Sequence, residues 1–108
     1  MRLPLRRSCY PRVSMARQAH SARIYLVRGR VQGVGFRDYA QRMAGALGVT
    51  GYVRNLDDGR VEVYAAGSPE KLSDLAAALR KGPHLADVRG VEEQEAALKH
   101  YSDFQIEV

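Results

Sequence analysis

The sequence predicts an α+β fold in which an antiparallel sheet carries two helices on one of its faces. Two observations support this prediction. Short segments rich in β-branched and aromatic residues alternate with two longer segments whose apolar residues recur at helical spacing. Glycine, proline and aspartate separate these segments, so the element order can be followed along the chain. A length of 108 residues suits one domain with a modest core, built without metal or disulfide support.

The first half of the domain is expected to contain one helix between strands. Residues 22–31 combine β-branched and aromatic residues without a cleanly polar face, which is typical of a central strand. A helix is expected from about Arg37 to Leu47, because apolar residues follow its period and Gly48 is placed to end it. A hairpin then follows, with strands at 49–55 and 60–66 and a turn at 56–59.

The second half begins with a helix that has its own start signals. Ser68 can cap it, Pro69 suits its first position and Glu70 complements the positive end of the helix dipole. Gly82 and the proline after it end this helix. The order β-α-β-β-α-β plus a short final strand is the ferredoxin-like arrangement, which many unrelated activities use. The last two strands of that order are expected at 86–95 and 102–108.

The formal net charge of +5 comes from the N-terminal end alone. Residues 1–21 hold five arginines and no acid, whereas the 12 basic and 12 acidic residues of 22–108 cancel. The folded part therefore has no net positive charge to draw it to nucleic acid, and no apolar run is long enough to span a membrane. We expect no nucleic-acid or membrane partner and a monomer. The single cysteine, Cys9, excludes an intramolecular disulfide and favours a reducing, cytoplasmic setting.

The N-terminal end has no helix or strand period. Residues 1–20 are predicted to be a disordered basic extension, and residues 21–108 the folded domain. Two alternatives stay open for this extension. It is arginine-rich and acid-free, like an organelle transit peptide, or it is an overlong start with Met15 as the true first residue.

The segment between the first strand and the first helix, GRVQGVGFR, has the features of an anion-binding loop. The first N–H groups of a helix lack internal partners, and glycines allow successive N–H groups to converge on an anion. Arg37 would add a planar, two-pronged donor, and a cation at a helix N-terminus is better explained if an anion lies beside it. The alternative is a plain turn with a solvated arginine. The segment matches neither the Walker loop nor the dinucleotide fingerprint, and it has no cysteine nucleophile.

Asn55 stands at the end of the second predicted strand. Its side chain offers both a donor and an acceptor, so it can orient a water molecule and stabilise oxygen charge. On its own, however, an asparagine just ahead of the Leu56-Asp57-Asp58-Gly59 turn is most simply a turn residue.

Taken together, these two segments resemble the acylphosphatase family. The family's first pattern is an apolar residue followed by G-x-V-Q-G-V-x-F-R, and the second is G-aromatic-V-basic-N, three residues, G-x-V, five residues, G. Both fall on the elements where the family places them, and the resemblance covers about residues 22–108. The first pattern is complete as Val27, Gly29, Val31, Gln32, Gly33, Val34, Phe36 and Arg37, and the second as Gly51, Tyr52, Val53, Arg54, Asn55, Gly59, Val61 and Gly67.

The resemblance implies hydrolysis of acyl phosphates to a carboxylate and inorganic phosphate, with no metal and no cofactor. It implies that Arg37 binds phosphate, or a sulfate in its place, and that Asn55 holds the attacking water. Leu56 stands where the family often has a hydroxyl residue, so we expect a changed rate rather than lost activity. Gly35 replaces a bulkier residue, which is expected to loosen the loop. The loop N–H groups that the resemblance assigns to substrate binding are those of Gln32, Gly33, Val34, Gly35 and Phe36, with that of Arg37.

Three rival interpretations use the same fold. A non-enzymatic anion-binding regulatory module is disfavoured by an intact Arg37 and Asn55. A carbamoyl-phosphate-processing domain of a larger maturation enzyme is disfavoured by the length of the chain. An RNA-binding version would need exposed aromatic residues on a basic sheet, and only 7% of the residues are aromatic.

Overall fold

The computed structural model describes residues 20–107, so the predictions for the N-terminal extension and for Cys9 lie outside the described residues. The elements have the predicted order, and all but the last strand begin and end within about one residue of the predicted positions. The final strand is shorter than expected. In chain order the elements are β1 (Ser21–Arg30), α1 (Phe36–Leu47), β2 (Thr50–Asn55), β3 (Val61–Gly67), α2 (Pro69–Lys81), β4 (Asp87–Ala96) and β5 (Phe104–Ile106).

The five strands form one sheet in the order β4-β1-β3-β2-β5. The four long strands pair antiparallel, as predicted, with Tyr25 opposite Val63 in the centre of the sheet. The short β5 pairs parallel with β2, so the complete sheet is mixed rather than purely antiparallel. The physical reason is a change of direction. After β4 the chain passes to the opposite edge of the sheet and reverses, so β5 runs in the same direction as β2.

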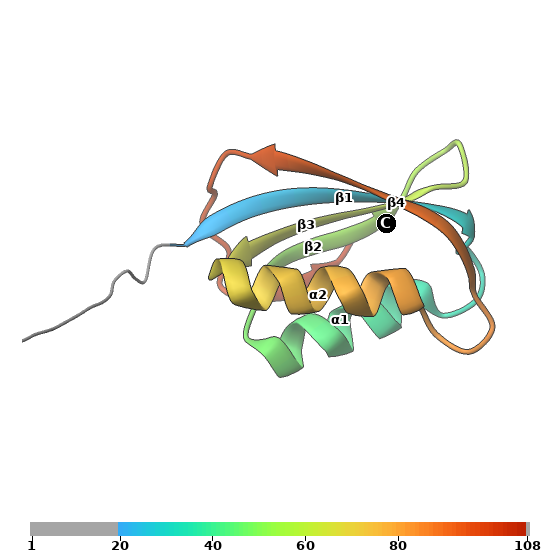
Figure 1. The fold of residues 1–108 in the computed structure, drawn as a ribbon, viewed down its shortest axis with the longest axis horizontal. Coiled ribbons are helices and arrows are strands. Elements are labelled where there is room, and N and C mark those ends of the chain that lie inside the picture. Colours follow the sequence, from blue (N-terminus) through green and yellow to red (C-terminus); the bar gives the residue numbers. More distant parts are fainter. Residues whose placement is uncertain (1–19, 108) are drawn as a thin grey trace, which may run out of the picture.

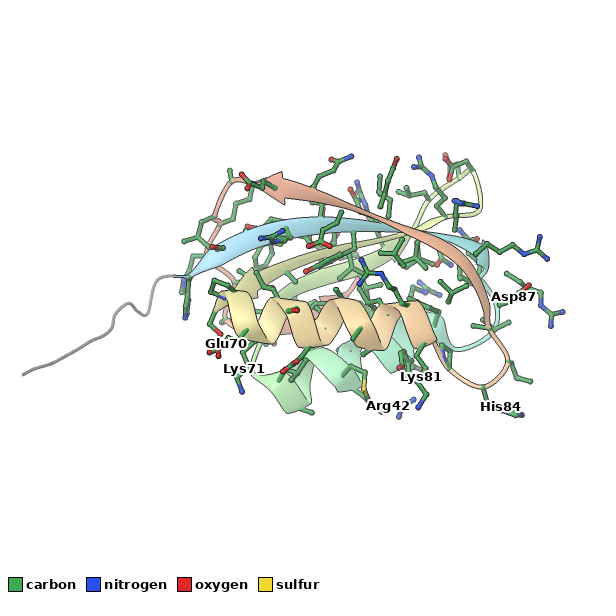
Figure 2. The ribbon with its side chains drawn as sticks, viewed as in Figure 1. Arg42, Glu70, Lys71, Lys81, His84 and Asp87 are labelled. Atoms are coloured by element: carbon green, nitrogen blue, oxygen red, sulfur yellow. The ribbon has the colours of Figure 1, made fainter. Side chains whose placement is uncertain are left out.

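Both helices cover the same face of the sheet, as Figure 1 shows. The hydrophobic core lies between these two layers, where Tyr25, Val27 and Val63 of the sheet are fully buried against Phe36 and Leu75 of the helices. Charged side chains cover the outer surface of the helical layer. Figure 2 shows that they point away from the sheet at Arg42, Glu70, Lys71 and Lys81.

The start of α2 confirms the predicted cap. The backbone N–H of Lys71 donates to the hydroxyl oxygen of Ser68 at 3.4 Å, and Pro69 is the first helical residue. Gly82 follows the last turn, and its N–H donates to the carbonyl oxygen of Ala78 at 2.9 Å. No helix in the described part of the chain is long and apolar enough to cross a membrane.

The opposite face of the sheet is partly covered by the segment that joins β4 to β5. Tyr64 fixes this segment, because its hydroxyl donates to the carbonyl oxygen of Ala97 at 2.6 Å and accepts from the N–H of Lys99 at 2.8 Å. Its ring also stacks on Tyr52 and tilts against Tyr101, with centroids 5.6 and 5.4 Å away. These rings therefore contact one another and anchor the connection that places β5 at the far edge.

Candidate active site

The loop between β1 and α1 has the backbone geometry of an anion-binding nest. Gly33 and Gly35 have φ angles of 74° and 79°, in the left-handed region that favours glycine. Gly35 is also the N-cap of α1, and no side chain caps the helix. The first helical N–H with a backbone partner is that of Tyr39, which donates to Gly35 at 3.0 Å. The N–H groups that precede it in the loop are thus left to bind an anion.

A pocket of about 130 Å³ opens at this loop. Its lining brings together the two segments that the sequence singled out, since two glycines of the loop, Arg37 and Asn55 all line it. Gln32 and Val34 do not line the pocket. Val34 packs against the hydrophobic core instead, so it contributes to the site only through its backbone. The complete lining is Val31, Gly33, Gly35, Phe36, Arg37, Asp38, Asn55 and Ile106.

Arg37 lies in the first turn of α1 and is half-buried. Its Nη1 donates to the backbone carbonyl oxygen of Glu107, at a distance of 3.4 Å. A guanidinium carries five N–H donors, so one such bond leaves most of them available to a ligand. Asp38 is the acidic residue of the same turn, where it complements the positive end of the helix dipole.

Asn55 is the last residue of β2 and pairs with Val61 of β3. Its side-chain oxygen, Oδ1, is buried and has no hydrogen-bond partner within the described structure. A buried acceptor without a partner costs about 1–3 kcal/mol, so such an atom is usually satisfied by water or a ligand. The amide therefore retains hydrogen-bonding capacity at the edge of the pocket.

Gln32 connects the loop to the β2–β3 turn. Its Nε2 donates to the carbonyl oxygens of Leu56 and Arg60, at 2.8 and 2.9 Å. The side chain is therefore turned toward the hairpin, and only its backbone N–H remains with the anion-binding loop.

Two arginines of the hairpin are engaged in ion pairs. Arg54 is exposed and pairs with Glu62. Arg60 pairs with Asp58 at 2.8 Å, and this hydrogen-bonded contact holds the pKa of the Asp58 carboxyl below its usual value. Asp58 also accepts from the backbone N–H of Arg60 at 3.1 Å, which confirms its predicted role in the turn. Arg37, by contrast, lines the pocket and makes no ion pair among the described residues.

The sequence did not predict two contributions from the C-terminal end. Ile106 lines the pocket and Glu107 accepts from Arg37. The N–H of Glu107 in turn donates to the carbonyl oxygen of Val53 at 2.8 Å, which extends the pairing of β5 with β2. The sequence predicts a strand at 102–108, but nothing in its local pattern indicates which strand it would join.

No group of three or more histidine, cysteine, aspartate or glutamate side chains is placed to hold a metal ion among residues 20–107. The three histidines, His20, His84 and His100, are all exposed.

Comparison with known proteins identifies the family. The acylphosphatase family model matches residues 23–106, which include every residue that lines the pocket. The chain belongs to the acylphosphatase family. An acylphosphatase of Solibacter usitatus is 67% identical over 85 residues, a match that covers 79% of this chain and 88% of that protein. An acylphosphatase of Archaeoglobus fulgidus is 49% identical over 80 residues, covering 74% and 90% of the two chains.

Solved acylphosphatase structures have the same fold. The acylphosphatase of Coxiella burnetii superposes with a TM-score of 0.81 at 35% sequence identity, covering 86% of this chain and 100% of the other. The chain is thus an acylphosphatase in sequence and in fold, and its activity is the hydrolysis of acyl phosphates to a carboxylate and inorganic phosphate.

Proposed function

We propose that Arg37 and the loop N–H groups hold the phosphate of the substrate while Asn55 holds the water that attacks it. The main observation in support of this proposal is that Arg37, the loop glycines and Asn55 line one pocket. It combines a guanidinium, a loop with two left-handed glycines and an asparagine whose Oδ1 lacks a partner. These groups supply charge, N–H donors and a water acceptor around one small space.

The substrate's chemistry explains why such a site suffices. Phosphoryl transfer depends mainly on positioning and on stabilising charge on the phosphate oxygens, which a guanidinium and backbone N–H groups provide. The leaving group is a carboxylate, whose conjugate acid has a pKa of about 4. It departs without protonation, so no histidine or carboxylic acid is needed as a general acid. Water held by Asn55 attacks phosphorus in line, and its proton passes to the phosphate.

Four further properties belong to this proposal. The enzyme works without a metal or cofactor, as a monomer, and in the cytoplasm. Phosphate and sulfate bind in the loop as product-like anions. The lone cysteine of the sequence supports a reducing compartment.

Hydrolysis of benzoyl phosphate by the purified protein tests this function. We expect turnover that chelators leave unchanged, and much slower hydrolysis of an alkyl phosphate monoester, whose alkoxide leaving group needs a general acid. Phosphate binding without any turnover would favour a non-enzymatic anion-binding module. Activity that is lost to a chelator and restored by a metal ion would refute the metal-free mechanism.

A further inference from the structure

The Gln32 side chain forms the direct link between the phosphate loop and the hairpin that carries Asn55. Its Nε2 donates to the carbonyl oxygens of Leu56 at 2.8 Å and Arg60 at 2.9 Å. The same two carbonyls close the turn, because Leu56 N–H donates to Arg60 at 2.8 Å and Gly59 N–H donates to Leu56 at 3.2 Å. Gln32 therefore adds a second donor to each carbonyl of an already closed turn.

In this arrangement the Gln32 side chain has no free N–H donor with which to contact phosphate. A primary amide has two N–H donors, and both point to the two hairpin carbonyls. Only the amide oxygen of Gln32 remains, and an acceptor repels phosphate oxygens. The side chain must therefore act on something other than the anion.

Asn55 is the group that this link can position. It is bonded directly to Leu56, and it lines the same pocket as Gly33, the residue that follows Gln32. Its Oδ1 makes no hydrogen bond in the described structure, so this acceptor does not fix the amide in place. We infer that Gln32 is a positioning residue, which fixes Asn55 and its water at the correct distance from the phosphate in the loop.

This inference rests on the proposed function and predicts a specific pattern of loss. A displacement of about 1 Å at a reacting group can cost on the order of 100-fold in rate. Removing the donors of Gln32 should therefore lower kcat. Phosphate affinity should be preserved, because Arg37 and the glycine geometry of the loop remain.

A double-mutant cycle on benzoyl phosphate hydrolysis tests the role. Gln32→Met keeps the size of the side chain and removes both donors, and Gln94→Met is the matched control at an exposed glutamine of β4. We expect Gln32→Met to lower kcat by roughly 10- to 100-fold with the phosphate inhibition constant nearly unchanged. In an Asn55→Ala background the same substitution should cost almost nothing further, because its effect passes through Asn55.

Two results would overturn the inference. The first is an equal loss of kcat with and without Asn55, and the second is a phosphate inhibition constant that rises as much as kcat falls. Failure of the proposed function would give a different result, because the wild type and Asn55→Ala would then hydrolyse benzoyl phosphate at the same rate.

A second variant keeps the test valid if Gln32→Met does not fold. Gln32→Glu is isosteric but accepts only when ionised, and it regains one donor when protonated. Its kcat relative to wild type should therefore rise as pH falls through the carboxyl pKa. A ratio that is flat with pH would contradict the positioning role. The side-chain amide of Asn55 should also become more mobile in this variant at neutral pH, and an unchanged NMR order parameter would count equally against it.

Discussion

The guanidinium of Arg37 donates to the carbonyl oxygen of Glu107, although 70 residues separate them in the sequence. Glu107 is itself held by the bond from its N–H to Val53 of β2. The strand that ends in Asn55 thus also supports the segment that orients Arg37. The phosphate-binding and water-binding groups of the proposed mechanism therefore share one structural support.

Replacing Asn55 should lower the catalytic rate while the protein still folds. Asn55→Ala removes the amide without adding charge, and we expect kcat for benzoyl phosphate to fall by roughly 100- to 1,000-fold, the usual cost of losing one positioned polar group. Asn55→Asp keeps the shape but places a carboxylate beside the anion, so KM should rise as well. Steady-state kinetics measure both effects, with circular dichroism as the folding control. Turnover within a few-fold of wild type in Asn55→Ala would disprove the water-holding role.

Gly51 should tolerate no side chain. Its φ is 144°, and a Cβ at this position would collide with the carbonyl oxygen of Tyr64 on the neighbouring strand. We expect Gly51→Ala to lower the free energy of unfolding by on the order of 3 kcal/mol, as measured by urea denaturation. Gly45→Ala is the control, because Gly45 lies in α1 with open space around it and alanine should stabilise the helix by about 0.5–1 kcal/mol. Equal stability of the two variants would contradict this account.

Tyr25 should make the domain sensitive to alkaline pH. Its ring is fully buried and its hydroxyl donates to the carbonyl oxygen of Leu72 at 3.1 Å, and burial raises the pKa of Tyr25 to about 12. An unfolded tyrosine ionises at a pKa of about 10. Below pH 10 both states are protonated. Between pH 10 and 12 only the unfolded state loses its proton, so the free energy of unfolding falls as pH rises.

Urea midpoints measured from pH 9 to pH 12 test this dependence. The decline should be smaller in Tyr25→Phe, which has no ionisable group at this position. A residual decline is expected, because burial also raises the pKa of Tyr39 and Tyr52. Identical slopes for wild type and Tyr25→Phe would show that Tyr25 is not the cause.

Local signals were sufficient to predict most of the fold. Ser68 and Gly82 mark the two ends of α2 through contacts with residues three or four positions away. The nearby sequence is therefore enough to predict where this helix begins and ends. An anion-binding loop was likewise expected from the glycines that precede a helix, and the structure gives Gly33 and Gly35 left-handed φ angles there. The parallel pairing of β5 was not predicted, because it depends on contacts between Val53 and Ile106 that no local pattern encodes.

The same limit applies to the candidate site. Arg37 and Asn55 were recognised from their motifs, but Glu107 reaches Arg37 only after β5 joins the sheet. Gln32 was expected to bind substrate through its backbone. The orientation of its side chain depends on two backbone carbonyls of the hairpin. Every residue has a backbone carbonyl, so the amino-acid pattern does not indicate these partners.

The inhibition constant of inorganic phosphate, compared between wild type, Arg37→Ala and Asn55→Ala, tests the division of roles most directly. Phosphate is the product of the reaction and occupies the proposed anion site without requiring turnover. We expect Arg37→Ala to lose phosphate inhibition, by at least about 100-fold, since a charged, positioned donor is removed. Asn55→Ala should keep phosphate inhibition close to the wild-type value. Near-normal inhibition of Arg37→Ala by phosphate would contradict the assignment of Arg37 as the phosphate-binding residue.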